Sequence, residues 1–464
     1  MFMKKENGWN RYSDEEKNWA FEFSDYYKNF LDKSKTEREF VHNALVMAQK
    51  KGFKNAEEMT KFVPGDKIYY VNRGKNLILA VIGEDDIESG VNMVVSHIDS
   101  PRLDLKQRPL YEDLEFALLK THYYGGIKKY QWATIPLALH GVVVLENGKR
   151  VDITIGEDES DPVFVIPDLL PHLSRVVQDD RKAREVIKGE ELIVIIGSMP
   201  SKIDDKDVKT KVKYAVMQKL NEKYGMIEED FISAEFELVP AAKAKDVGLD
   251  RALVGAYGQD DRVCAYTSLI AILDISESEN PPKKSAVVYL ADKEEIGSNG
   301  ATGLESKYLE YFMGDISFKI NEKNSEQRMR KGLWNSRAIS ADVNASMDPI
   351  FKSVHDEMNA GKCGYGIIFT KFTGHGGKYG SNDADAEFVA EIRAMLNKEK
   401  IIWQSAELGK VDEGGGGTVA KFLAAYGMKV IDAGPGLISM HAPYEVASKL
   451  DIFECFRAYK LFLK

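Results

Sequence analysis

Residues 284–298 read Lys-Ser-Ala-Val-Val-Tyr-Leu-Ala-Asp-Lys-Glu-Glu-Ile-Gly-Ser, an apolar run that leads into two adjacent glutamates. A short apolar run bounded by polar residues is typical of a buried strand. Two neighbouring carboxylates at the end of such a strand repel each other unless a cation or a shared proton relieves the charge. Glu294 and Glu295 are therefore either a metal ligand beside a proton-transferring group or a solvated turn after an edge strand. The remaining sequence favours the first interpretation.

Further strand-like runs occur early and late in the chain, at 77–82, 93–96, 253–257, 339–341, 366–369 and 428–431. Apolar residues at helical spacing precede or separate these runs, at 14–31, 36–51, 263–273, 384–397, 418–426 and 444–462. Strands that alternate with helices build an α/β sheet. We therefore predict an α/β fold with a mixed sheet that helices cover on both faces.

The pattern changes between residues 108 and 245. The segment 142–155 contains Glu-Asn-Gly-Lys between two apolar runs, and Asn-Gly is the preferred turn of a β-hairpin. Two more strand-like runs, at 192–196 and 234–238, and one helical pattern, at 208–224, follow. Since 464 residues are too many for one ordinary core, we predict a β-rich domain at 108–245, inserted into an α/β domain made of 1–107 and 246–464.

The composition excludes several classes of protein. A net charge of −10 without a long basic run argues against nucleic acid or an anionic membrane as the main partner. The N-terminus carries two lysines without an apolar stretch behind them, and no segment reaches the roughly 20 apolar residues that span a bilayer. The three cysteines are far apart and form no Cys-x-x-Cys pair. We expect a cytoplasmic protein without disulfides or a thiolate metal site.

Residues that could bind metal follow several of the apolar runs: His97, Asp260, Glu294, Glu295, Asp342 and His441. Open α/β sheets bind ligands outside the carboxyl ends of their strands, so these side chains are expected to converge. Imidazole and carboxylate suit Zn²⁺, Co²⁺ or Mn²⁺, and one aspartate can bridge two ions roughly 3.5–4 Å apart. The His97-x-Asp99 spacing supports this, because a carboxylate can fix the tautomer of a metal-binding histidine. A single histidine after a strand is more often structural.

The order of these residues resembles that of the M18 metallopeptidases, the aspartyl aminopeptidase family. The matching segments cover nearly the whole chain: Ser-His-Ile-Asp-Ser-Pro at 96–101, Asp-Lys-Glu-Glu-Ile-Gly-Ser at 292–298, Ser-Ala-Asp at 340–342, and Gly434-Pro435 through Met440-His441. The resemblance implies a two-metal aminopeptidase with a β-rich inserted domain that helps subunits associate. In that family, twelve subunits form a tetrahedral shell whose active sites face inward.

The resemblance also implies roles for individual residues. His97 and Asp342 would bind one metal, Glu295 and His441 the other, and Asp260 would bridge them. Glu294 would be the general base that takes a proton from water and passes it to the leaving amine, and Asp99 would orient His97. We expect Glu294 to point away from Glu295, because successive side chains of an extended chain alternate. His172 matches a histidine that the inserted domain sends into a neighbouring subunit's active site; the alternative is a surface histidine without a role.

Departures from the family pattern concern the choice of substrate. Members usually carry histidines soon after the position of Asp342, whereas residues 343–349 here read Val-Asn-Ala-Ser-Met-Asp-Pro. The stretch 123–132 lacks the Trp-Phe-Asp ending of eukaryotic members. Lys371 lies near the family's position for a lysine that faces a substrate carboxylate, so a preference for N-terminal Asp or Glu remains open. Lys371 could equally be a solvated lysine at a strand end.

The glycine run at 414–417 precedes a helical pattern but lacks the Gly-Lys-Ser/Thr ending of a nucleotide-binding loop. It could approach a peptide substrate closely or be a flexible turn. Two other functions remain as alternatives to a metalloaminopeptidase. One is a related two-metal deacylase or carboxypeptidase, and the other is a non-catalytic binding protein on a peptidase fold. Peptides with free amino termini, compared with N-acyl amino acids, separate the enzymes.

Overall fold

The computed structural model describes residues 6–203 and 207–464. The two N-terminal lysines considered above, Lys4 and Lys5, lie outside the described residues. The chain forms two compact units. The α/β unit consists of residues 1–100, 244–440 and 444–464, and the inserted unit consists of residues 101–243 and 441–443. The first boundary predicted from sequence, 107/108, falls inside a strand, β5 (Arg102–Asp113).

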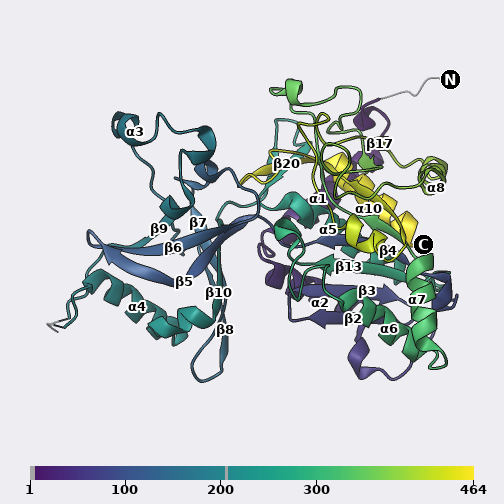
Figure 1. Cartoon of the computed structure of the whole chain (residues 1–464), viewed down its shortest axis with the longest axis horizontal. Coiled ribbons are helices and arrows are strands. Elements are labelled where there is room, and N and C mark those ends of the chain that lie inside the picture. Colours follow the sequence, from purple (N-terminus) through teal and green to yellow (C-terminus); the bar gives the residue numbers. More distant parts are fainter. Residues whose placement is uncertain (1–5, 204–206) are drawn as a thin grey trace. The chain divides into compact units, whose positions relative to one another are not determined.

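A nine-stranded sheet forms the centre of the α/β unit (Figure 1). Its strands in spatial order are β1 (Lys54–Asn55), β2 (Lys67–Asn72), β3 (Asn76–Val81), β13 (Ala286–Ala291), β4 (Asn92–His97), β14 (Arg337–Ser340), β18 (Lys429–Gly434), β16 (Ile367–Thr370) and β17 (Trp403–Ser405). The four strands β13, β4, β14 and β18 are parallel neighbours. In contrast, β3 runs antiparallel to both β2 and β13, and β16 runs antiparallel to β18 but parallel to β17. The sheet is therefore mixed, as predicted.

Helices cover both faces of this sheet, which confirms the predicted fold class. One apolar core joins the sheet to α1 (Asp14–Leu31), α2 (Glu37–Lys50), α5 (Gln259–Ile275), α8 (Ala386–Lys398) and α10 (Lys449–Leu463). A second core lies between the opposite face and α6 (Tyr308–Ile320), α7 (Ser325–Asn335) and α9 (Ala420–Ala424). The strands β13 and β4 are buried along their whole length because they contribute side chains to both cores.

A smaller, five-stranded sheet also belongs to the α/β unit. Its order is β11 (Lys245–Val247), β12 (Leu253–Ala256), β20 (Glu445–Ser448), β19 (Gly436–Ile438) and β15 (Asn344–Ala345). The helix predicted at 444–462 begins only at Lys449, because residues 445–448 pair with β12 and β19. The strand predicted at 253–257 lies in this smaller sheet and not in the large one. Its carboxyl end is therefore not one of the parallel strand ends at the edge of the large sheet.

The inserted unit is built on an antiparallel sheet, as its β-rich sequence predicts. The strand order is β8 (Arg150–Ile155), β7 (Leu137–Val144), β10 (Ala234–Pro240), β5, β6 (Phe116–Tyr124) and β9 (Ile193–Gly197). The predicted Asn-Gly hairpin is confirmed as the β7–β8 pair. Two helices, α3 (Pro171–Val177) and α4 (Lys211–Tyr224), belong to the same unit. The long pair β5–β6 was missed because charged residues interrupt its apolar pattern.

Within the described ranges, no helix combines the length and the apolar character that crossing a bilayer requires.

Candidate metal centre

Three neighbouring strands bring candidate ligands to one edge of the large sheet. His97 is the last residue of β4, Glu294 and Glu295 follow β13, and Asp342 follows β14. Because β13 and β14 flank β4 and run parallel to it, the three carboxyl ends lie side by side. The topology thus gathers residues that are far apart in the sequence.

Asp260 reaches the same place from a different element, the start of α5. The preceding Gly258 has φ +66°, and a Cβ atom on it would lie 1.6 Å from the guanidinium of Arg262, so the turn requires glycine. The buried Arg262 holds the turn by donating from Nε to the carbonyl oxygen of Gly258 at 2.8 Å. Ser100 Oγ donates to the backbone carbonyl of Asp260 at 2.8 Å, and the Asp260 N–H donates to Glu445 Oε2 at 3.0 Å.

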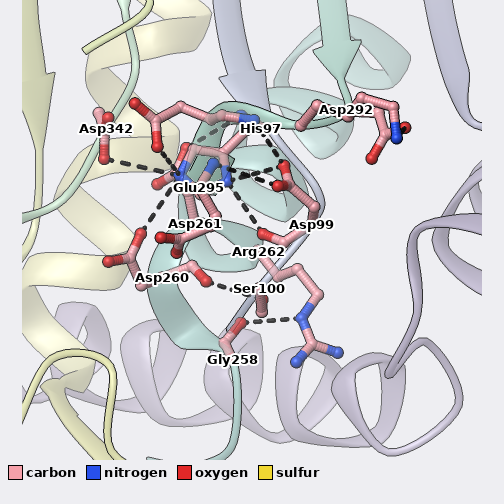
Figure 2. Close-up of polar contacts among 12 residues, drawn as sticks. His97, Asp99, Ser100, Gly258, Asp260, Asp261, Arg262, Asp292, Glu295 and Asp342 are labelled. Atoms are coloured by element: carbon pink, nitrogen blue, oxygen red, sulfur yellow. Dashed lines mark hydrogen bonds and ion pairs between the residues drawn. The ribbon is translucent and has the colours of Figure 1, made fainter. Parts of the chain in front are cut away.

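Figure 2 shows the carboxylates of Asp260 and Asp342 turned toward His97. His97 Nε2 lies 3.3 Å from Asp260 Oδ1 and 3.9 Å from Asp342 Oδ1. One ligand atom from each of the three residues lies within 4.8 Å of the other two. Tetrahedral zinc with ligands at about 2.0–2.1 Å needs neighbouring donor atoms about 3.3 Å apart. The three donors fit a zinc ion after small adjustments of their side chains.

Asp99 connects His97 with the glutamate pair. His97 Nδ1 lies 3.0 Å from the backbone carbonyl oxygen of Asp99 and 3.4 Å from its Oδ1. Both are acceptors, so Nδ1 carries a ring proton, and Nε2, the nitrogen that faces Asp260 and Asp342, would present its lone pair to a bound cation. The Asp99 carboxylate also accepts the backbone N–H groups of Glu294 and Glu295, at 3.1 and 3.2 Å. One buried carboxylate therefore positions both halves of the site.

The site holds more negative charge than its buried setting favours. Burial raises the pKa of Asp342, the charges of Glu294 and Asp260 raise it further, and His97 opposes them. Burial also raises the pKa of the adjacent Asp261, as does the charge of Asp342. Burial lowers the pKa of His97, but contacts with the Asp260 and Asp99 carboxylates outweigh it and raise that pKa. A divalent cation among these groups would offset the repulsion.

Glu294 and Glu295 lie in a single 3₁₀ turn, Glu294–Ile296, that begins after Lys293 in the left-handed region. The expectation that extended geometry separates the two side chains is therefore wrong, because the chain leaves the extended conformation at Lys293. Glu294 Oε2 lies 4.0 Å from His97 Nε2 and faces the first group of ligands. A carboxylate oxygen of Glu295 lies within 4.8 Å of a carboxylate oxygen of Asp260.

His441 lies in the three-residue segment 441–443, which belongs by its contacts to the inserted unit, although its chain neighbours Met440 and Tyr444 belong to the α/β unit. Within the inserted unit, His441 Nδ1 lies 2.8 Å from the carbonyl oxygen of Gly126. This contact places the proton on Nδ1 and the lone pair on Nε2, as a metal ligand requires.

The two residues considered for substrate binding are exposed. His172 is on α3 of the inserted unit, and Lys371 follows β16 of the α/β unit. The glycine run at 414–417 packs against its own chain: the carbonyl oxygen of Gly416 accepts the Gly374 N–H at 2.7 Å. A Cβ atom on Gly415, whose φ is +114°, would lie 1.8 Å from the Gly374 carbonyl oxygen. At least one glycine in the run thus permits two loops to touch.

Sequence reasoning missed three residues that support the ligands: Ser100, Asp261 and Glu445. Asp261 is fully buried and its Oδ2 accepts the backbone N–H of His97 at 3.3 Å. Its position beside Asp260 repeats the paired-acid pattern of Glu294 and Glu295, which is a signal that could have identified it. Glu445 is also buried, but nothing in its sequence surroundings distinguishes it from a surface acid.

Comparison with known proteins shows the family to which the chain belongs. The model of the family described as aminopeptidase I zinc metalloprotease (M18) matches residues 30–463. A probable M18 family aminopeptidase 1 of Borreliella afzelii is 56% identical over 463 residues, covering 100% of both chains. The crystal structure of an M18 family aminopeptidase from Thermotoga maritima has a TM-score of 0.94 and 47% identity, with 100% of both chains covered.

A more distant likeness concerns the fold alone. The mApe1 dodecamer of S. cerevisiae has a TM-score of 0.78 and 21% identity, covering 96% of this chain and 97% of that one. The family model and the close relatives span essentially the whole length of the chain, so neither unit falls outside the match. The chain therefore belongs to the M18 family of zinc metalloproteases and is an aminopeptidase, a hydrolase of the exopeptidase type.

Proposed function

We propose that this aminopeptidase uses two divalent metal ions, most simply zinc, held by five side chains. His97 and Asp342 hold one ion, Glu295 and His441 the other, and Asp260 bridges them. The observation that carries the proposal is the close grouping of His97 Nε2 with carboxylate oxygens of Asp260 and Asp342, all within 4.8 Å of one another. The second grouping consists of Asp260, Glu295 and His441, whose ligand atoms also lie within 4.8 Å of one another. Co²⁺ or Mn²⁺ could replace zinc at such donors.

Bound zinc supplies Lewis acidity, which activates water and polarises the scissile carbonyl. Glu294 is then the general base: it takes a proton from the attacking water and delivers it to the leaving amine. Its Oε2 lies 4.0 Å from His97 Nε2, and 19% of its side-chain surface is exposed, so water and substrate can reach it. The Asp99 carboxylate accepts the Glu294 backbone N–H, and the Asp99 carbonyl oxygen faces the His97 ring. Asp99 thus fixes the position of the proposed base relative to the proposed metal ligand.

An aminoacyl peptide library tests the reaction class. Apoprotein is incubated with Zn²⁺, Co²⁺ or Mn²⁺, and release of the first residue is measured for peptides with free and with acylated amino termini. We expect hydrolysis only of the free amino termini. Hydrolysis only of N-acyl substrates would favour the two-metal deacylase, and bound metal without any hydrolysis would favour a non-catalytic binding protein.

We propose a preference for peptides that begin with Asp or Glu, read by Lys371. The support is the charge and exposure of this lysine where the buried strand β16 ends. Its test compares kcat/KM for Asp, Glu, Ala and Leu amino termini in the protein and in Lys371→Met. Loss of acidic selectivity with unchanged hydrolysis of Ala termini is expected; identical profiles in both proteins would remove Lys371 from this role.

We propose that the protein is a homo-oligomer, in the form of a tetrahedral dodecamer, in which His172 reaches a neighbouring subunit's active site. The support is the apolar surface of α3 and its start, where Leu170, Leu173 and Val176 are 51%, 55% and 88% exposed. Such a cluster favours contact with another protein surface. Light scattering should give about twelve times the chain mass, and a monomer that retains full activity would contradict both parts of the proposal.

We also propose a cytoplasmic location. The free thiols of Cys264, Cys363 and Cys455 support it, because thiols persist in a reducing compartment. Cell fractionation followed by immunodetection tests this proposal, and recovery outside the cytoplasm would contradict it.

A further inference from the structure

The loop that carries the two glutamates is held on one side by the strand next to it. In the large sheet, β13 lies between β4 and β3. On the β4 side, the Asp99 carboxylate accepts the N–H groups of Glu294 and Glu295. The loop itself is compact, since the Ser298 N–H donates to the Lys293 carbonyl at 2.7 Å. This side belongs to the candidate metal centre.

On the β3 side, a second set of contacts holds the same loop. Thr302 Oγ1 donates to Asp292 Oδ2 at 2.5 Å, and so closes the loop from its far end onto the residue that precedes Lys293. Asn76, the first residue of β3, donates from Nδ2 to the Thr302 carbonyl oxygen at 2.5 Å. Its Nδ2 also lies 3.3 Å from the Tyr289 hydroxyl on β13. We call Asn76, Thr302 and Asp292 the clamp.

The clamp is buried, and its parts have little freedom to move. Asn76, Asp292 and Thr302 are 0%, 1% and 3% exposed. Asn76 pairs with Asn72 at the end of the β2–β3 ladder, so it is fixed to the sheet. Asn72 adds a weaker contact at the partly exposed end of this hairpin, where its Nδ2 donates to the Ala301 carbonyl oxygen at 3.1 Å.

A buried carboxylate this close to the site is costly unless it performs a task. Asp292 lies two residues before Glu294, and burial raises its pKa to about 6, with the charges of Glu37 and Asp99 contributing. An apolar residue there would avoid this cost, but it could not accept the Thr302 hydroxyl. The contact fixes the separation between the two ends of the loop, and hence the start of the 3₁₀ turn at Glu294.

We propose that the clamp positions the carboxylate of Glu294 for proton transfer, with Asp292 and Thr302 as positioning residues that do not touch substrate. This inference rests on the proposed role of Glu294 as general base. Proton transfer depends steeply on the placement of the base, whereas binding of the substrate amino terminus depends on other groups. Loosening the clamp should therefore lower kcat and leave KM unchanged.

Thr302→Val tests the proposal, because valine keeps the shape of threonine but removes the hydroxyl. With saturating zinc, we expect kcat to fall about 10- to 100-fold, with KM and zinc content unchanged. Thr302→Ser, which restores the hydroxyl, should recover most of kcat. The matched control is Thr267→Val, which removes an equally buried hydroxyl from the middle of α5, where Oγ1 donates to the Val263 carbonyl at 2.8 Å. It should have nearly normal kcat.

Three results would overturn the proposal: normal kcat in folded Thr302→Val, equal losses in Thr302→Val and Thr267→Val, or no recovery in Thr302→Ser. If Thr302→Val does not fold, Asn72→Ala decides, with a few-fold loss of kcat expected and an unchanged kcat contradicting the clamp. Glu294→Gln is measured in parallel. Normal turnover in Glu294→Gln would refute the proposed base itself, whereas its loss together with normal Thr302→Val would refute the clamp alone.

Discussion

Two groups of buried acids in the α/β unit differ in the partners that surround them. In the metal centre, the carboxylates of Asp99, Asp260, Glu294 and Asp342 face the imidazole of His97. At α10, the buried Asp451 and Glu454 are met by donors. Asp451 accepts the N–H groups of Gly364 and Gly366, at 2.8 and 2.7 Å. Glu454 accepts the Tyr12 hydroxyl, the Ile402 N–H and the Arg457 guanidinium, at 2.5, 3.0 and 2.8 Å.

The difference separates a structural acid from a ligand. The carboxylates at α10 connect a helix to loops through hydrogen bonds within the chain, so they need no further partner. In both groups the charge of a neighbouring acid raises a pKa: Glu454 raises that of Asp451, and Glu294 and Asp260 raise that of Asp342. In the metal centre, however, the acids converge on the same histidine, His97. Fold stability alone does not favour such a cluster, because separated acids would be less costly. The proposed cation would explain its arrangement.

Metal removal should have the largest effect on turnover. It should affect the acids of the metal centre and not those at α10. Zinc contributes several kcal/mol of transition-state stabilisation, so chelation should reduce turnover by about 10³-fold or more. Added zinc should restore it and raise the melting temperature, since zinc binds the folded state. In Asp451→Asn the zinc-dependent rise in melting temperature should be the same. If zinc no longer raised the melting temperature of Asp451→Asn, the acids at α10 would also be needed for zinc binding, and the two groups would not have separate roles.

Glu294→Gln should come next, with a fall in kcat of about 10²- to 10⁴-fold. Glutamine keeps the size of the side chain but cannot accept the proton. Zinc content, measured by atomic absorption, should not change. The neighbouring Glu295→Gln is the matched variant and should lose zinc, because it alters a proposed ligand. Equal zinc loss in both variants would show that the two glutamates do not have separate roles.

Asp99→Asn should give a smaller loss, about 10- to 100-fold in activity or zinc affinity, as is usual for a group that orients a metal ligand. Asparagine can accept with one oxygen only, whereas Asp99 accepts the Glu294 and Glu295 N–H groups with two. Zinc titration and steady-state kinetics measure the loss. Unchanged values in both would show that backbone packing alone holds the turn.

Asp451→Asn should have the smallest effect on catalysis and a measurable one on stability. Above pH 8, where Asp451 is ionised, one backbone donor would lose its acceptor in the variant. This loss costs about 1–3 kcal/mol, while kcat per bound zinc stays the same. Chemical denaturation measures the first and kinetics the second. A loss of kcat without a loss of stability would make Asp451 part of the catalytic machinery.

The same variant should also change how the free energy of unfolding depends on pH. Burial raises the pKa of Asp451 from its ordinary value of 3.8 to about 8, although hydrogen bonds from Gly364 and Gly366 lower it, and the charge of Glu454 also raises it. Between those values the folded protein binds more protons than the unfolded one, so Asp451 makes stability fall as pH rises. Asp451→Asn should therefore lose less stability than the unsubstituted protein between pH 5 and 8. An identical slope in both would contradict the raised pKa.

The sequence predicted those parts of the fold and site that depend on local pattern. Apolar runs located β13 and β4, and the residues that follow them identified His97 and Glu294. It did not predict that β12 leaves the large sheet, because pairing with β20 depends on residues almost 200 positions away. Glu445 was missed for the same reason: its burial follows from that pairing. The clamp was also invisible, since Asn76 and Thr302 are ordinary loop and strand-end residues until the sheet brings them together.

The measurement that most directly tests the account is anomalous X-ray scattering at the zinc absorption edge, on crystals of the protein grown with zinc. We expect one peak within bonding distance of His97 Nε2, Asp260 and Asp342, and a second beside Asp260, Glu295 and His441. Peaks that avoid these side chains, in crystals of active protein, would contradict it.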